Sequence, residues 1–291
     1  MKKYFSVLLL SSLTGSAFAV APINTDVSAG YTYDDNVTRA ELDQDIETDS
    51  VLNVDASAAY KIPVNNISYF SLGGTLEVDQ YLDFSKLSNT RLGLHGSYFI
   101  RPSAGYTAIR YFAKLSYEQR LYSSEQRDGS ATEVSLGLSK RLTDLLAMRL
   151  GFIKQDISAN SAVFDADNSR YYIDLDYKTT KNNIVYLTLG YIDGDVVSTA
   201  ARTDGLVASS SAIVRDDAFL GLEPARFAYK LAAKTTTISI GDNFTVGSNQ
   251  SIDASLQYYK SESDYYDPAA LADINISYVG LIYNLNYLYR F

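Results

Sequence analysis

The sequence predicts an all-β chain that closes into a transmembrane, antiparallel, up-and-down β-barrel of about 12 strands, with both termini in the periplasm. Three observations lead to this prediction. Apolar and polar residues alternate with a period of two along most of the chain, tight turns and long acidic connections follow one another between the alternating segments, and the alternation runs on to a terminal Phe291. An even number of strands, short periplasmic turns and long outer loops are typical of bacterial outer-membrane barrels.

Composition excludes several other classes of protein. The 291 residues carry 25 Lys and Arg against 34 Asp and Glu, a net charge of −9, whereas nucleic-acid-binding domains normally present a basic face. We therefore expect no nucleic-acid partner. The chain has no Cys and a single His, which leaves no thiolate, disulfide or imidazole cluster for chemistry. We expect no metal, no cofactor and no enzymatic activity.

The amino terminus has the pattern of a secretory signal peptide. Lys2 and Lys3 precede an apolar stretch over residues 4–10, and Ala17-Phe18-Ala19 forms a small-x-small cleavage site. We predict a signal peptide over residues 1–19 and a single outer-membrane β-barrel domain over residues 20–291. No later apolar run is long enough for a transmembrane helix.

The alternating segments predict the strands. Apolar residues occupy every second position in each of them, as at Phe70, Leu72, Leu76 and Val78. The segments cover residues 27–34, 69–79, 91–100, 109–118, 134–138, 146–152, 171–177, 185–191, 252–258 and 283–291. Several extend to about ten residues, which suits a tilted strand that crosses a bilayer better than the shorter strands of a secreted β-sandwich or soluble barrel.

The connections predict the number of strands. Tight turns are expected at residues 63–66, 101–105, 143–144 and 180–183, and longer acidic connections at 37–49, 83–88, 122–131, 155–168, 193–225 and 261–273. One hairpin for each long connection makes about 12 strands. The fifth long connection either folds into the mouth of the barrel or forms a disordered external loop. The apolar positions change parity between 227–233 and 238–240, which predicts a β-bulge near residues 235–237.

Strict alternation also predicts which charged side chains point inward. If the apolar set faces lipid, the opposite set faces the lumen and lines a pore. The predicted pore-lining residues are Arg91, Arg110, Lys114, Arg149, Asp55, Glu77, Glu118, Glu133, Asp174 and Asp176. These charges either face one another across water as a transverse field or form salt bridges that fill the interior.

Two sets of side chains are candidates for chemistry. The sequence His95-Gly96-Ser97 is similar to the His-Ser pair of outer-membrane phospholipases, but the pair faces lipid in that family, whereas alternation turns His95 and Ser97 inward here. We therefore do not expect a nucleophilic Ser. The acids of residues 34–49 lack the spacing of a calcium loop, so we expect them to be solvated loop acids.

Two short stretches resemble known bacterial outer-membrane proteins. Tyr283, Leu285, Tyr287, Tyr289 and Phe291 form an ending that resembles the C-terminal signal for barrel insertion, which implies that the barrel-assembly machinery is a partner through Phe291. The stretch Tyr33-Asp34-Asp35-Asn36-Val37 resembles the opening of β-barrel porin families associated with exopolysaccharide and surface export. This resemblance implies passage of a polysaccharide or its fragments. Inward aromatics would then either stack on sugars or pack the wall, and these are Tyr69, Tyr172 and Tyr186.

These observations favour one function over two others. We expect a porin-like channel of the bacterial outer membrane, surrounded by outer-membrane lipid, that passes small hydrophilic solutes or oligosaccharides. The alternative is a closed barrel with a structural, adhesion or surface-assembly role through its acidic loops. A lipid-modifying enzyme is disfavoured by the inward orientation predicted for His95 and Ser97.

Overall fold

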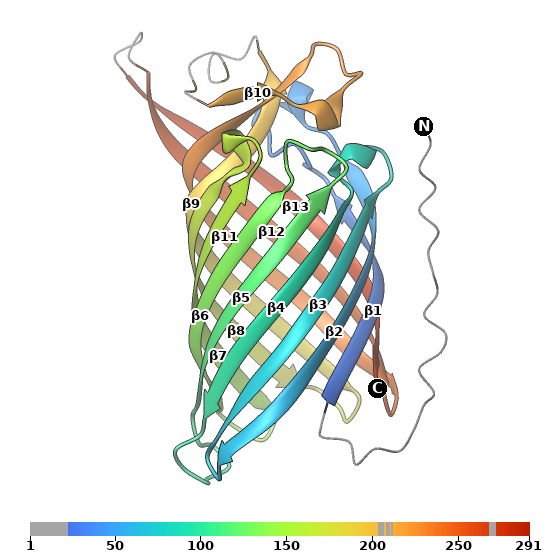
Figure 1. Cartoon of the computed structure of the whole chain (residues 1–291), viewed down its shortest axis with the longest axis vertical. Helices are drawn as coiled ribbons and strands as arrows, with labels where there is room; N and C mark the ends of the chain where they lie inside the picture. Colours follow the sequence, from blue (N-terminus) through green and yellow to red (C-terminus); the bar gives the residue numbers. More distant parts are fainter. Residues whose placement is uncertain (1–22, 203–206, 208–209, 211, 268–271) are drawn as a thin grey trace.

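The computed structural model describes residues 23–202, 207, 210, 212–267 and 272–291, and the side chains of these residues outside 264–275. They form a tall cylinder of tilted strands with loops gathered at one end (Figure 1). The predicted signal peptide, residues 1–19, lies outside the described residues and stays a prediction. Among the described residues, no helix is long and apolar enough to span a membrane.

Twelve long strands form the barrel, as the alternation predicts. Each strand pairs antiparallel with the next along the chain, and β13 returns to β1 through pairs such as Tyr283 with Tyr33. The barrel strands are β1 (Ile23–Asp34), β2 (Asp49–Asn65), β3 (Ser68–Tyr81), β4 (Asn89–Ile100), β5 (Arg110–Tyr122), β6 (Gly129–Arg141), β7 (Leu146–Ala159), β8 (Ala166–Lys178), β9 (Asn183–Ala201), β11 (Arg226–Gly247), β12 (Gln250–Asp267) and β13 (Ala272–Arg290). The short strand β10 (Ile213–Arg215) lies in the connection between β9 and β11 and pairs with β11.

Apolar side chains cover the outside of the barrel because they occupy alternate positions of each strand. Leu72 is 53% exposed, Leu94 71% and Leu285 53%, and all three follow the predicted lipid-facing parity. A continuous apolar belt of this kind would be unstable in water, whereas hydrocarbon solvates it. Because the twelve strands described here close on themselves, none of them leaves an unpaired edge inside that belt.

Short turns gather at one end of the barrel and long loops at the other. The tight turns lie at 66–67, 142–145, 179–182 and 248–249, and a longer turn covers 101–109. Both ends of the described chain lie at the short-turn end, where Arg290 contacts Asp26 at 2.6 Å and the Phe291 amide donates to the Thr25 carbonyl (Figure 1). The predicted alternation of short and long connections is confirmed except at 101–109, where a tight turn was predicted and the connection is longer than the opposite loop 82–88.

Two strands continue further at the loop end of the barrel than the sequence predicted. β9 continues to Ala201 and β12 to Asp267, so the predicted loops 193–225 and 261–273 are too long. The extension of β9 pairs with β11 and that of β12 pairs with β13, and side chains of β9, β11 and β13 bury an apolar cluster together with Val207. This cluster consists of Ala200, Val207, Tyr229, Leu231 and Ile276.

The predicted bulge at residues 235–237 is wrong. β11 keeps a continuous register with β9 from Arg226 to Phe244, and its register shifts only near the short-turn end, between Thr245 and Gly247. The parity of the apolar residues changes for another reason. Tyr229 and Leu231 lie on the inner face of β11, where they join the buried cluster at the loop end, instead of facing lipid.

Candidate pore and its mouth

The ten predicted pore-lining residues lie on the face of the sheet opposite the apolar belt, and neighbouring strands pair many of their charges. Arg91 of β4 lies 2.9 Å from both Glu77 and Asp79 of β3. Lys114 lies 3.9 Å from Glu133, and the Arg149 and Asp174 side chains are 3.3 Å apart. These salt bridges join neighbouring strands along the wall, and they do not decide between a transverse field and a filled interior.

The remaining predicted residues have local partners or line cavities. Asp55 accepts a hydrogen bond from Ser28 at 3.0 Å, and Glu118 pairs with Arg120 at 2.7 Å. Arg110 donates to Ser139 at 3.3 Å, and Asp176 lines a cavity at the short-turn end together with Arg110 and Arg149. Whether all ten line a conducting pore stays a prediction.

A sector of neutral polar side chains, which sequence reasoning missed, completes the inner wall. It lies on β11, β12 and β13, whereas the charged residues concentrate on β2 to β8. Thr235 shares a 2.9 Å hydrogen bond with Ser261, and Asn284 donates to Ser255 at 3.3 Å and accepts from Thr32. These residues follow the same alternation as the charged ones, but they carry no charge that would mark them as inward.

Two of the predicted inner aromatics pack against the wall. A Cβ added at Gly151 would overlap the ring of Tyr172, and one added at Gly241 would overlap the ring of Tyr186. The rings therefore occupy the space above glycines of neighbouring strands, and the Tyr186 hydroxyl donates to Asp253 at 2.9 Å. Tyr69 instead stacks on Phe99, with ring centroids 4.8 Å apart.

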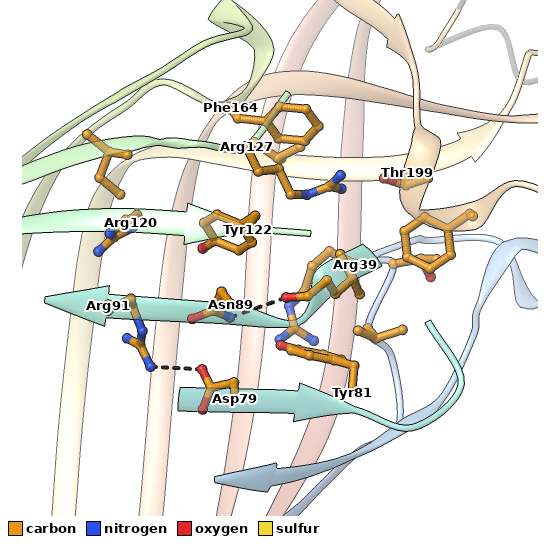
Figure 2. A pocket seen from close by; sticks show the side chains of 16 residues that line it. Arg39, Asp79, Tyr81, Asn89, Arg91, Arg120, Tyr122, Arg127, Phe164 and Thr199 are labelled. Carbon is orange, nitrogen blue, oxygen red and sulfur yellow. Dashed lines mark hydrogen bonds and ion pairs between the residues drawn. The ribbon is translucent and has the colours of Figure 1, made fainter. Parts of the chain in front are cut away.

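A cavity of about 460 Å³ with both polar and apolar side chains in its lining, the upper chamber, lies inside the barrel at the loop end (Figure 2). β3, β4 and β5 contribute paired polar residues, and the loops contribute aromatic rings and further arginines. Its lining includes Arg39, Asp79, Tyr81, Asn89, Arg91, Arg120, Tyr122, Arg127, Phe164, Thr199 and Phe219. Each of these four arginines pairs with a carboxylate, so the chamber presents fixed donors and acceptors with little unpaired charge.

The first long loop, residues 35–48, folds into the mouth and forms one side of the upper chamber. The Thr199 amide of β9 donates to the Thr38 carbonyl at 2.8 Å, and the Ser198 hydroxyl donates to the Arg39 carbonyl at 2.6 Å. Burial disfavours the Arg39 cation, but the Asp34 carboxylate at 2.6 Å outweighs this effect and raises the pKa of the guanidinium. The loop is therefore part of the packed interior of the mouth.

The prediction that the acids of residues 34–49 are all solvated is wrong for three of them. Asp34, Asp45 and Asp49 are buried, whereas Glu41 and Asp43 are exposed as predicted. Burial of these carboxylates is possible because each has a partner. Asp45 pairs with Arg226 at 2.6 Å, Arg39 neutralises Asp34, and the backbone amides of residues 50, 83 and 84 donate to Asp49.

Part of the fifth long connection, residues 212–225, crosses the mouth, and we call it the strap. Asp216 accepts hydrogen bonds from Arg127 at 2.9 and 2.8 Å, and Asp217 accepts one from Ser124 at 2.5 Å. Phe219 packs on Phe84, with ring centroids 4.6 Å apart. This connection was predicted either to fold into the mouth or to form a disordered external loop. Its described part folds into the mouth.

Comparisons with known proteins give the fold class. No family model matches the chain, and no curated protein does. The crystal structure of the COG4313 outer membrane channel from Pseudomonas putida F1 superposes with a TM-score of 0.57 at 13% identity, over 97% of this chain and 100% of that one. The fold is that of an outer-membrane β-barrel. The KdgM porin gives a TM-score of 0.43 at 9% identity, over 91% of this chain and 98% of the porin.

The predicted fold, an outer-membrane β-barrel, is therefore confirmed. Because no family model matches, the finer resemblance carried by residues 33–37 stays a prediction. In the structure, Asp34 and Asn36 of that stretch are buried where loop 35–48 enters the mouth.

His95 and Ser97 both lie on the inner face of β4, as predicted. Among the described residues they do not hydrogen bond to each other, and the His95 ring lies over Gly73 of β3. In the part of the chain that the structure describes, no group of three or more His, Cys, Asp or Glu is placed to hold a metal ion. His95 and Ser97 are therefore not arranged as a base and its nucleophile in this structure.

The residues that organise the mouth were missed by sequence reasoning. Arg39, Arg127, Asp216 and Arg226 lie in or beside predicted loops, where no period marks a side chain as inward. One weak signal was available, since Arg226 directly precedes the apolar positions of β11. Arg127 pairs with Asp216 and Arg226 with Asp45, partners that are distant in the sequence, and a periodic pattern carries no information about such pairs.

Proposed function

We propose that this barrel is a channel of the bacterial outer membrane that passes small hydrophilic solutes or oligosaccharides. The observation that carries the proposal is the upper chamber, a cavity of about 460 Å³ with arginines, tyrosines and an aspartate in its lining, inside a closed barrel whose outside is apolar. A 12-stranded barrel is intermediate between small barrels filled by side chains and wide porins, so a narrow passage fits its size.

The lining of the upper chamber supports an uncharged, hydroxyl-rich solute. Paired side chains such as Arg91 with Asp79 offer hydrogen bonds in fixed directions, and the rings of Tyr81 and Tyr122 offer apolar faces. Sugars have this combination of hydroxyl groups and apolar C–H faces. The neutral polar sector of β11 to β13 would extend such contacts along the lumen.

The same proposal covers orientation and partners. The long loops would lie outside the cell, both termini would lie in the periplasm, and the apolar belt would contact outer-membrane lipid. The Phe291 side chain is 71% exposed and packs edge-on against Tyr289, so it is accessible to the barrel-assembly machinery.

We further propose that the barrel has no hydrolytic activity. Hydrolysis by a Ser needs an adjacent general base, and His95 and Ser97 share no hydrogen bond. A phospholipid hydrolysis assay of the folded protein, with Ser97→Ala as the comparison, tests this. Hydrolysis that depends on Ser97 would overturn it.

A second candidate function is a closed barrel that acts in adhesion or surface assembly. The observation that favours it is the strap, which crosses the mouth and is held there by buried Asp216. Exposed acids on loop 35–48, such as Glu41 and Asp43, would then meet the partner.

Single-channel conductance of the refolded mature protein in a planar bilayer separates the two candidates. A channel gives discrete current steps, and proteoliposomes that contain it swell in maltose but not in a large dextran. A folded, heat-modifiable barrel that gives neither steps nor swelling, including after removal of the strap contact by Arg127→Ala, would support the closed-barrel role.

A further inference from the structure

A second cavity, the lower vestibule, lies at the short-turn end of the barrel on the side of β5 to β8. Its volume is about 370 Å³, which is within the size range of small-ligand pockets. Among the described residues, four arginines and one carboxylate line it, and Lys140 borders it from the outer face of β6. The lining side chains are Arg101, Arg110, Arg141, Arg149 and Asp176.

The basic groups of the lower vestibule differ from those of the upper chamber in their partners. In the upper chamber each of the four arginines pairs with a carboxylate. In the lower vestibule, Arg149 pairs with Asp174, but no described carboxylate lies within ion-pair distance of Arg101, Arg110 or Arg141. A chain with a net charge of −9 thus concentrates unpaired positive charge at one place.

Aromatic rings and neutral groups hold these three guanidiniums in place. Arg110 lies 5.7 Å from the Phe99 ring centroid and donates to Ser139, and Arg141 lies 4.8 Å from the Tyr106 centroid. Arg101 donates to the Gly105 carbonyl at 2.6 Å. Each contact orients the guanidinium, and none supplies a negative charge, so N–H donors remain for an anion.

We propose that the lower vestibule is a binding site for small solutes with two or more carboxylate or phosphate groups. The mutual repulsion of its unpaired cations favours an anion, and several separated guanidiniums match a ligand with several oxyanion groups. The site would draw anionic solutes to the short-turn mouth in spite of the acidic chain. This inference rests on the proposed channel function, because a channel gives these solutes access to the vestibule.

Citrate provides the probe, since it carries three carboxylates, and trimethyl citrate provides a nearly isosteric neutral control. Single-channel current is recorded in phosphatidylcholine bilayers with each compound added to either side in turn. We expect citrate to block more strongly from the short-turn side and trimethyl citrate not to block. The block should weaken at high KCl because salt screens the attraction.

The double variant Arg110→Gln and Arg141→Gln removes two of the unpaired charges, and Arg290→Gln is the matched control. Arg290 lies at the same end but pairs with Asp26 on another part of the wall. The half-blocking concentration of citrate should rise about tenfold or more in the double variant and stay unchanged in the control. The KCl reversal potential should shift from anion towards cation preference only in the double variant.

The outcomes separate this inference from the channel proposal. A barrel that conducts but shows equal block by citrate and trimethyl citrate, or equal block in all variants, would overturn the vestibule site alone. Loss of citrate block and of anion selectivity when phosphatidylglycerol is added to the bilayer would assign the cluster to lipid headgroups and also overturn it. A barrel that does not conduct ends the channel proposal, and citrate calorimetry on the detergent-folded protein and its double variant then tests the site directly.

Discussion

Arg127, in the loop between β5 and β6, forms a two-pronged ion pair with Asp216 of the strap, 89 residues later in the chain. The Asp216 side chain has no exposed surface, and that of Arg127 is 11% exposed. The pair fastens the strap to the far side of the mouth, directly above the upper chamber. Asp216 also accepts a hydrogen bond from Thr199 of β9, so it joins three parts of the rim.

Breaking this pair should release the strap. Arg127→Ala leaves a buried carboxylate without its cation, which typically costs about 3–5 kcal/mol. We expect a larger single-channel conductance and faster tryptic cleavage at Arg215 within the strap, while the barrel stays heat-modifiable. Arg290→Ala, which removes an exposed arginine at the other end, should change neither. Unchanged conductance together with unchanged cleavage would show that the pair does not hold the strap.

The pair between Asp45 and Arg226 should fasten loop 35–48 in the same way. The two side chains are 0% and 4% exposed, so Asp45→Ala should destabilise the folded mouth by about 3–5 kcal/mol. Replacing both partners at once, by Asp45→Leu with Arg226→Met, should recover much of that loss because no buried charge remains. Proteolysis of loop 35–48 under native conditions measures the effect. A double variant that is cleaved as readily as Asp45→Ala would contradict the pairing argument.

Whether a strand residue faces lipid or the lumen predicts whether a charged substitution there is tolerated. Leu150 and Leu187 belong to the outer apolar set, so Arg at either position near the bilayer midplane should cost about 2–4 kcal/mol of folding free energy. Ser116 lies on the inner face beside Glu133, and Ser116→Arg should cost little. Unfolding of the three variants in lipid vesicles with urea measures this difference. Equal costs would mean that the assignment of faces is wrong.

The contact between Tyr172 and Gly151 should contribute to the rigidity of the wall. Gly151→Ala places a methyl group where the ring lies, and overpacking of this kind costs about 1–3 kcal/mol. Adding Tyr172→Ala should relieve the clash, so the double variant is expected to lose less than the sum of the two single losses. Gly105→Ala, where the added Cβ meets no atom within 4 Å, is the control. Urea unfolding in detergent gives the four values.

Much of the barrel could be predicted from the chain because a strand repeats every two residues. The alternation at Leu72, Leu94 and Leu285 separates the outer face from the inner one, and the alternating connection lengths lead to twelve strands. The same period places Glu77 and Arg91 on one face, although their 2.9 Å contact also needs the register between β3 and β4. The facing of the residues and the lengths of the connections are local features, so each can be predicted from the sequence of one or two hairpins.

The mouth depended on contacts that no local pattern records. Burial of Asp45 requires Arg226 at the start of β11, and the position of the strap requires Arg127 of the loop between β5 and β6. The inward orientation of Tyr229 likewise follows from the buried cluster beyond the membrane, where strand pairing continues but lipid no longer selects the apolar face. Periodicity therefore specifies the wall of this barrel, because successive residues of each strand face lipid and lumen in turn and must be apolar or polar accordingly. The closure of its mouth follows from charge pairs between distant loops, which become neighbours only when the barrel has formed.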